Sequence, residues 1–464
     1  MACVLCFRLG TPVVKNVPER RCFLVAKTMV ESGEWWVPQL HGEPRLSKPP
    51  LYYWAVAATA TQFYAGEVTK TALRLPAALC ALALVALTFA WGWRIGGAAH
   101  GLFAAILLVG MKWFFVLGRR GVAEMPLAFF CIAALFCYER LRATRRAALL
   151  PVFALCVALA VLAKATVALL VIGLPIGLDL LLRGEARAAL RPRVLAWVGA
   201  ALVAGFGWYG VVIARVPGAW DALEMALWLP VGIESTVVQN TNTHHHPSLL
   251  HYLPLFPDLA LPALLLLPLA LVRAWRTRFW GGDAARRFPA LAFTALFVAF
   301  SLFPQKQRHY LLPLLPLLAL VLAEPLAYAV ATWPDAVRRW LRLLGPLAAA
   351  GGALLLAVFT GFYAGLLEAP ALQIAALLAL GGAAIAGCAL AGLRGRVVAF
   401  AACCAVGWLG ATAVVRLDYE IHRSLYKHGQ LALRSDDAAR RWQHAFERLD
   451  RLEDRFSGRQ LGSE

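Results

Sequence analysis

The chain has 464 residues, of which 61% are hydrophobic and only 15% are charged. Soluble domains are about 45–50% apolar and about 25% charged, so the composition excludes an ordinary soluble protein and indicates a polytopic membrane protein. The formal net charge of +19 does not predict nucleic-acid binding, because the arginines gather in short loops between apolar segments, as they do on the cytoplasmic side of membrane proteins.

The start of the chain predicts a short apolar segment followed by an outer-face loop. Residues 1–14 are too few to cross a bilayer, and we interpret them as a truncated first transmembrane segment. Residues 15–71 predict a loop with interfacial helices, the first of which would hold Glu19 and Arg21 at the water boundary. The segment Leu51–Gly66 contains polar residues. If it crossed the membrane, every later loop would be assigned to the opposite side, against the positive-inside rule, so we expect this segment to lie in the outer interface.

Residues 72–416 predict a transmembrane bundle. Apolar runs of about 20 residues, the length that a helix needs to cross the hydrocarbon, begin near Leu73, Gly101, Val122, Ala147, Ala165, Val194, Leu250, Phe288, Tyr310, Leu343, Leu372 and Val397. Basic patches occupy every second loop, which is the pattern of the positive-inside rule. The other loops therefore face outward, and they include Arg119–Glu124, Ala163–Lys164, Val216–Leu249 and Pro304–His309. Residues 417–464 carry apolar residues at helical spacing and predict an amphipathic, non-cytoplasmic tail.

These runs predict an all-α polytopic membrane protein with about twelve transmembrane helices. Charged residues in its outward loops are the candidate functional groups. Lys164 is flanked by apolar residues, and it either snorkels from a helix end or contacts a phosphate. Lys306 and Arg308 are positively charged residues in an outward-facing loop, where the positive-inside rule disfavours them. Their position therefore favours an anionic ligand over a solvated turn. Arg119 and Glu124 form another outward cluster, for which a simple ion pair is the alternative.

With Arg21 and Lys48 added, the outward cations predict a basic pocket for a lipid phosphate or pyrophosphate. Glu19 and Glu124 are the acids placed to act there as a base or a metal ligand. The sequence has no GxxxxGK[ST] loop and no HExxH helix, so ATP-driven transport and zinc proteolysis lack their usual signatures. The histidines 244–246 fit a flexible His-rich loop better than a metal site.

The motifs also occur in a recognisable order. The order is PERRCFLVAKTMVESGEWWVP, SKPPLYYW, ALRLPAAL, RRGVAEMPLAFF, LAKATVALL and FPQKQRHYLLPLLP. From Glu19 to Pro316, this order resembles GT-C glycosyltransferases, namely the bacterial aminoarabinose lipid A transferases and the related protein O-mannosyltransferase-like enzymes. The resemblance implies a GT-C-like helical bundle with interfacial helices on its outer face. It also implies inverting sugar transfer from an undecaprenyl-phosphate donor at the outer, periplasmic face of a bacterial inner membrane.

The resemblance implies roles for particular residues. Lys48 matches the lysine that meets the lipid phosphate in the family's KPPL motif, and Lys164 matches the lysine of a TKG-like motif. Lys306 and Tyr310 match a later SKxxxY-like motif, and Arg21 matches the arginine of a DExRY stretch.

The chain departs from the family at acidic positions. The family's leading aspartate is Pro18 here, with Glu19 beside it, and its second aspartate is Glu124. The acid before KPPL, a metal ligand in the lipid A enzyme, is Ser47. The sequence therefore leaves open whether a divalent metal is a cofactor. It also leaves open the donor sugar and whether the acceptor is lipid A, another glycan or a protein.

The leading hypothesis is a membrane glycosyltransferase that uses a polyprenyl-phosphate-linked sugar in the lipid bilayer. A lipid or sugar transporter or flippase would use the same basic pocket, and this alternative predicts internal repeats and interrupted helices. The sequence shows no such repeat, and its large loops all fall on one face. A non-catalytic relative is the third hypothesis, and Pro18 and Ser47 are the residues that motivate it.

Overall fold

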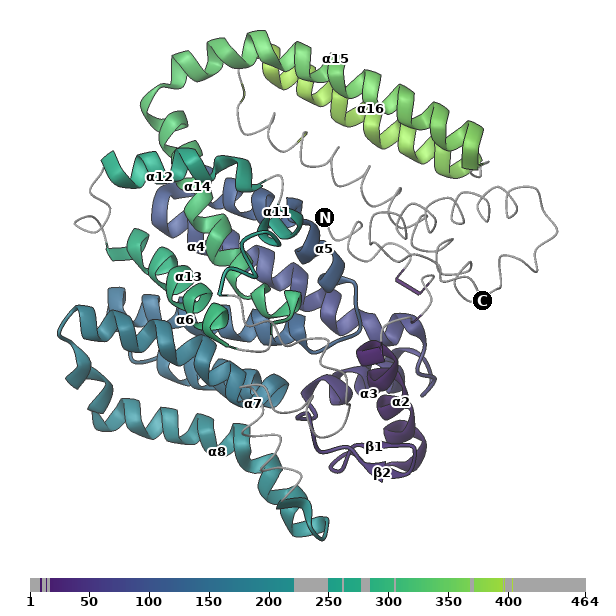
Figure 1. Ribbon diagram of the computed structural model, residues 1–464, viewed down its shortest axis with the longest axis vertical. Coiled ribbons are helices and arrows are strands. Elements are labelled where there is room, and N and C mark those ends of the chain that lie inside the picture. Colours follow the sequence, from purple (N-terminus) through teal and green to yellow (C-terminus); the bar gives the residue numbers. More distant parts are fainter. Residues whose placement is uncertain are drawn as a thin grey trace, which may run out of the picture. The chain divides into compact units, whose positions relative to one another are not determined.

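The computed structural model describes residues 9–10, 14, 17–220, 249–260, 263–276, 284–303, 306–367, 371–394, 396 and 403. The chain divides into two compact units, one of Met1–Gly10 with Asn16–Thr332 and one of Thr11–Lys15 with Trp333–Glu464. Almost all the regular structure in these ranges is helical (Figure 1), which agrees with the predicted helical membrane fold. The predicted count of about twelve spans stays a prediction. The expected tail 417–464, the histidines 244–246 and most of the run after Val397 lie outside the described residues.

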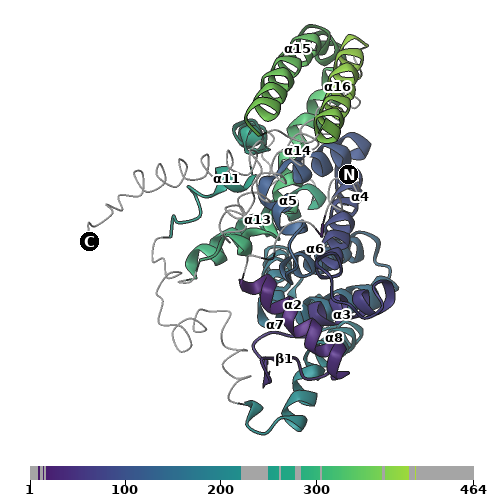
Figure 2. The same ribbon diagram turned by 90° about the vertical axis from the view of Figure 1, so that its right-hand side faces the viewer.

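The first unit begins with a small substructure around α2 (Val17–Ser32) and α3 (Leu51–Phe63). The strands β1 (Gln39–Leu40) and β2 (Glu43–Pro44) pair antiparallel between these two helices in sequence. Figures 1 and 2 both show α2 and α3 side by side, next to this hairpin. The apolar stripe of α2 is its buried face, made of Cys22, Val25, Ala26 and Met29. The helix expected within Leu51–Gly66 is α3, and its depth in a membrane stays a prediction.

The long helix α4 (Lys70–Gly110) doubles back on itself. Thr69 caps its start, because its side-chain oxygen accepts a hydrogen bond of 3.0 Å from the Ala72 amide. Gly96 and Gly97 leave helical geometry, and Gly97 has φ +80°, a conformation that glycine adopts without steric cost. A Cβ added at Gly92 would lie only 2.8 Å from the Gly101 Cα, so the two halves of α4 pack directly against each other.

A second helical series follows. Its members are α5 (Lys112–Gly118), α6 (Glu124–Thr144), α7 (Leu149–Leu182), the short 3-10 helix η1 (Ala186–Leu190) and α8 (Pro192–Arg215). The helix α7 packs against both α6 and α8. Like α4, it is interrupted, here at Lys164 and Ala165, whose backbone angles are not helical.

Polar contacts define the two ends of α6 and of the second part of α7. At one end, Glu124 pairs with Lys164. At the other end, Asp179 accepts hydrogen bonds from the Tyr138 hydroxyl at 2.7 Å and from Arg183 Nε at 2.8 Å. The two segments therefore run in the same direction. This direction agrees with the loop parity predicted from the basic patches, because the arginine-rich loops lie at the Asp179 end.

The rest of the first unit is α11 (Phe256–Ala260), η3 (Ala263–Leu266), α12 (Leu267–Arg276), α13 (Ala284–Leu302), η5 (Arg308–Leu311) and α14 (Leu314–Thr332). The helix α14 packs against α4, where His100 Nε2 lies 2.9 Å from the Leu320 carbonyl oxygen. The second unit contains α15 (Pro334–Leu367) and α16 (Ala371–Leu393), which pack on each other as a hairpin (Figure 2). By length and composition, four of the described helices are able to cross a membrane, namely α4, α7, α8 and α14.

Candidate active site

Glu124 is the centre of the candidate site. It is the first residue of α6, and its side chain is only 9% exposed. Lys164 Nζ lies 3.4 Å from Glu124 Oε1, and His309 Nε2 lies 3.7 Å from the same oxygen. Lys164 Nζ also lies 5.1 Å from the centroid of the Tyr310 ring, within the range of a cation–π interaction. Residues from α6, α7 and η5 therefore meet at one point.

The interruption of α7 explains how a lysine reaches this point. Lys164 has φ −159° and ψ 51°, and Ala165 has φ 33°, so the helix stops and restarts between them. A non-glycine residue at positive φ is strained by about 1–3 kcal/mol, and such strain persists only where the surrounding packing holds it. Ala165 is buried in a cluster with Leu46, Trp208 and other apolar residues. This cluster places the loop before α3 beside the lysine.

That loop carries Lys48. The Lys48 ammonium is close enough to Glu124 for the two charges to interact. It also lies near Cys22 of α2, where its charge favours a lower pKa of the thiol. Burial raises the pKa of Cys22 to about 12, and the nearby charges include Lys48, Glu124 and Glu19. Cys22 is therefore a neutral, unreactive thiol that packs as an apolar group near these charged residues. Lys164 therefore lies at the Glu124 carboxylate, and Lys48 is near enough to interact with it electrostatically.

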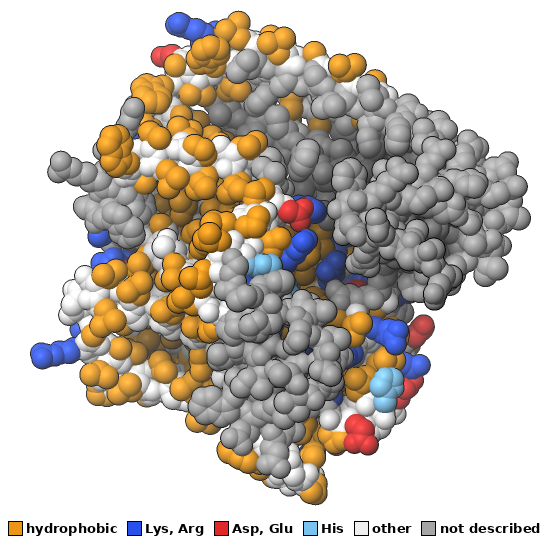
Figure 3. Space-filling view, viewed as in Figure 1, with side chains coloured by type: hydrophobic (Ala, Val, Ile, Leu, Met, Phe, Trp, Pro, Cys, Tyr) orange, Lys and Arg blue, Asp and Glu red, His pale blue; other side chains and the backbone are white. Residues whose placement is uncertain are grey.

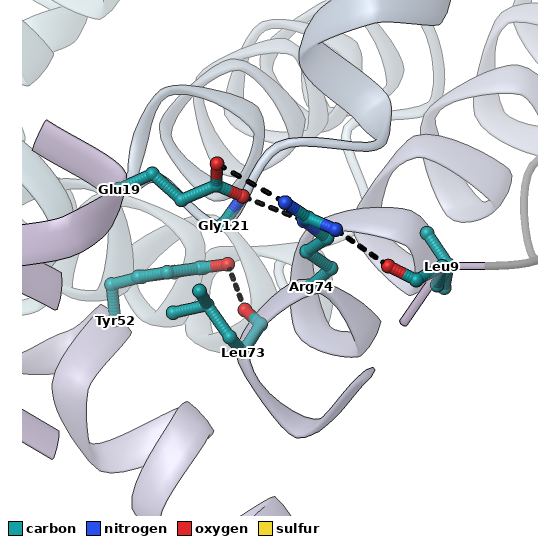
Figure 4. A network of polar contacts seen from close by, with 6 residues as sticks. All are labelled: Leu9, Glu19, Tyr52, Leu73, Arg74 and Gly121. Atoms are coloured by element: carbon teal, nitrogen blue, oxygen red, sulfur yellow. Dashed lines mark hydrogen bonds and ion pairs between the residues drawn. The ribbon is translucent and has the colours of Figure 1, made fainter. Parts of the chain in front are cut away.

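Glu19 lies in a buried network that borders this site (Figure 4). Its carboxylate accepts hydrogen bonds from Arg74 Nε at 2.7 Å, from Arg74 Nη2 at 3.3 Å and from the Gly121 amide at 2.9 Å. Arg74 Nη1 donates a further bond of 2.7 Å to the Leu9 carbonyl. Glu19 and Arg74 are each 3% exposed. The network ties α2 to α4 and to the loop that leads into Glu124.

The other predicted cations lie around η5. Lys306 is 3% exposed, its Nζ donates a hydrogen bond of 2.6 Å to the Phe303 carbonyl, and burial lowers its pKa. Arg308 Nη1 lies 3.5 Å from Asp258 Oδ2 of α11, and Lys112 of α5 pairs with the other oxygen of Asp258. Figure 3 shows acidic and basic side chains gathered near α11, within a face rich in hydrophobic side chains.

The remaining predicted cations are Arg119 and Arg21. The Arg119 guanidinium lies 5.5 Å from the centroid of the Phe115 ring, at the end of α5. Arg21 is partly buried on α2, two positions after Glu19. Their predicted roles in substrate binding stay predictions.

Sequence reasoning missed His309, Arg74 and Asp258. Arg74 did carry a signal, because a charge inside the apolar run ALRLPAAL requires a partner in a membrane protein. His309 lies between two residues that the sequence did single out, Arg308 and Tyr310. Its nearness to Glu124 follows only from the fold.

The described residues do not form a site for a resident metal. No group of three or more His, Cys, Asp or Glu side chains comes together among them. Glu124 and His309 are two suitable ligand types, but the Lys164 ammonium already lies at the carboxylate. The Ser47 hydroxyl, at the position of the family's acid, is buried and has no hydrogen-bond partner in the described part of the chain. We therefore derive no step through a metal.

The fold corresponds to that of known membrane proteins. Residues 47–209, which include Lys48, Glu124 and Lys164, match the family model of dolichyl-phosphate-mannose-protein mannosyltransferases. The chain has the fold of ArnT from Cupriavidus metallidurans, whose crystal structure bound to undecaprenyl phosphate superimposes with a TM-score of 0.65 at 21% identity, covering 92% of this chain and 79% of ArnT. The predicted resemblance to GT-C polyprenyl-phosphate-sugar glycosyltransferases is confirmed.

The chain is also similar to individual proteins of other bacteria. The chain is 27% identical over 311 residues to the undecaprenyl phosphate-alpha-4-amino-4-deoxy-L-arabinose arabinosyl transferase 1 of Sodalis glossinidius, covering 66% of this chain and 53% of that protein. It is 26% identical over 308 residues to an uncharacterized protein of Aquifex aeolicus, covering 64% of this chain and 57% of that protein. The chain therefore spans little more than half the length of these relatives.

Proposed function

We propose that this chain is a membrane glycosyltransferase that moves a sugar from a polyprenyl-phosphate donor to an envelope acceptor. The acceptor would be lipid A, another glycan or a protein, at the outer face of a bacterial inner membrane. The observation that carries the proposal is the contact between Lys164 and Glu124, with Lys48 near enough to interact with the same carboxylate. The matched family and the ArnT complex with undecaprenyl phosphate support a donor of this kind.

The lysines would bind the donor phosphate. A partly buried ammonium is poorly solvated, so it gains more from a phosphate than a lysine in water does. As the bond to the sugar breaks, negative charge grows on the phosphate, and fixed cations stabilise that charge. Lys306, Arg308 and Tyr310 would line the same space, with Arg21 and Arg119 at its margins.

The two acids would differ in role. Glu124 faces Lys164 and His309 and would orient groups at the reacting centre. Glu19 is engaged by Arg74 and Gly121, so it would position the loop that carries Glu124 rather than touch the acceptor.

The test compares Lys164→Ala and Lys48→Ala with the wild-type chain. Purified protein is given undecaprenyl-phosphate 4-amino-4-deoxyarabinose or polyprenyl-phosphate mannose together with envelope membranes, and labelled sugar in the acceptor fraction is measured. We expect both variants to lose at least about 100-fold in transfer, because each removes stabilisation of the charge that develops on the phosphate. Lys27→Ala, at an exposed lysine paired with Glu31, is the matched control.

Undiminished transfer by both lysine variants would reject the phosphate-binding role. Movement of the intact donor across a vesicle membrane without sugar transfer would support a transporter instead. Binding of the donor without either activity would support a non-catalytic relative.

A further inference from the structure

His309 is more exposed than Glu124 and Lys164, the two charged groups that it meets at the centre of the candidate site. Its side chain is 26% exposed, whereas that of Glu124 is 9% exposed. An acceptor that approaches the cluster therefore meets the imidazole before it meets the carboxylate. The His309 ring also lies across the Tyr310 ring, with centroids 4.7 Å apart and an interplanar angle of 81°, so it is held at an edge-to-face contact.

Glu124 is placed to orient this imidazole. The same oxygen, Oε1, lies 3.4 Å from the Lys164 ammonium and 3.7 Å from His309 Nε2. A carboxylate beside an ammonium is stabilised in its charged form, which makes it a weak base. A charged carboxylate next to an imidazole favours the tautomer with its proton on the facing nitrogen and stabilises the imidazolium once a second proton arrives.

We propose that His309 is the catalytic base of the transfer reaction and that Glu124 is its positioning partner. This inference rests on the proposed function and deepens it. His309 Nε2–H would face the Glu124 carboxylate, and Nδ1 would take the proton of the acceptor. The acceptor would therefore be a hydroxyl group, because a phosphate that is already ionised needs no base.

In the proposed step, the acceptor hydroxyl oxygen forms a bond to the anomeric carbon of the donor sugar while its proton passes to His309 Nδ1. The bond between the anomeric carbon and the phosphate oxygen breaks, and its electron pair stays on the polyprenyl phosphate, next to Lys164. The imidazolium then releases its proton to water.

The charged surroundings of His309 determine its pH dependence. The helix α13 packs against η5 and brings Phe300 to Tyr310, but it carries no charged residue beyond Arg287. Among the described residues, the titratable and charged groups near the ring include Glu124 from α6, Lys164 from α7, and Lys306, Arg308 and Tyr310 from its own loop. Lys48 also interacts with Glu124, and Asp258 of α11 pairs with Arg308. Because Glu124 is the group that Nε2 faces, removing its charge should weaken the base.

The experiment measures kcat/KM against pH for the wild type, His309→Gln and His309→Ala, using the donor that supports wild-type transfer. We expect a loss of about 10²–10⁴-fold in both variants, the usual contribution of a general base. The acidic limb of the wild-type profile should disappear in His309→Gln, and the KM for the donor should change little. Free imidazole should restore part of the rate of His309→Ala, which a purely structural role would not allow.

His41→Asn is the control, since His41 is an exposed histidine of the β1–β2 turn. A His309→Gln variant with the wild-type rate and pH profile would overturn the inference. A reduced rate with an unchanged profile and no rescue by imidazole would also overturn it. If Lys164→Ala is inactive in the same assay, the proposed function stands and only the role of His309 is lost. If the wild type transfers no sugar from either donor, the proposed function itself fails.

Discussion

At the scale of single residues, a buried ion pair connects several elements of the first unit. Glu19 and Arg74 are almost completely buried, and every oxygen of the Glu19 carboxylate is hydrogen-bonded. Such a pair adds little net stability compared with apolar residues of the same shape, but removing one partner leaves the other charge buried and unpaired. The pair therefore controls whether α2, α4 and the loop before Glu124 stay together.

We predict that Glu19→Ala and Arg74→Ala each destabilise the folded chain by about 3–5 kcal/mol. Tryptophan fluorescence during thermal unfolding in detergent would measure the change. The control is Lys27→Ala, because Lys27 and Glu31 form an exposed pair at 3.6 Å, worth at most about 1 kcal/mol. Wild-type unfolding of Glu19→Ala together with complete loss of transfer would contradict the structural role and favour Glu19 as a catalytic acid or base.

From the sequence alone, a functional candidate can be singled out where a charge contradicts its surroundings. Lys164 stands in the apolar run VLAKATVALL and Glu124 opens another, so both were identified without the fold, and they meet in the structure. His309 was missed because an imidazole in a polar loop is unremarkable in sequence. Its partner lies 185 positions earlier in the chain, and no local pattern reports such a contact.

At the scale of elements, interrupted helices define the architecture. The sequence predicts separate spans from Leu73 and Gly101, and in the structure α4 consists of two helical halves joined at the non-helical residues Gly96 and Gly97. Glycine signals this turn, because it supplies positive φ and permits close contact between the two halves. The interruption of α7 at Lys164 and Ala165 contains no glycine. The charge of Lys164 within an apolar run is therefore its only signal in the sequence.

We predict that Gly101→Ala disrupts the α4 hairpin. A Cβ there would lie 2.5 Å from the Phe89 carbonyl oxygen and 2.8 Å from the Trp93 amide nitrogen, and backbone atoms cannot move aside cheaply. We expect a loss of about 1–3 kcal/mol or more, seen as a lower unfolding temperature in detergent. Gly173→Ala in α7, where an added Cβ meets nothing within 4 Å, should change stability by no more than about 1 kcal/mol. Equal behaviour of the two variants would argue against the hairpin.

At the scale of the whole molecule, charge separates the two ends of the helical bundle of the first unit. The candidate site lies where α6 begins, and the arginine-rich loops lie where α6 and α7 end. The positive-inside rule predicted this separation from the sequence, since it depends only on which loops carry arginine. The rule could not predict which outward residues meet, because their contacts depend on how α2, α3 and η5 pack on the bundle.

This separation predicts the sidedness of the protein in cells. A cysteine introduced at the exposed position Glu43, in strand β2 shortly before Lys48, should react with a membrane-impermeant maleimide in cells whose outer membrane alone is permeabilised. A cysteine at the exposed position Arg187, in an arginine-rich loop, should react only after the inner membrane is opened. The wild-type chain gives the background from its own 10 cysteines. Labelling of Arg187→Cys before Glu43→Cys would place the candidate site on the cytoplasmic side, out of reach of acceptors on the outer face.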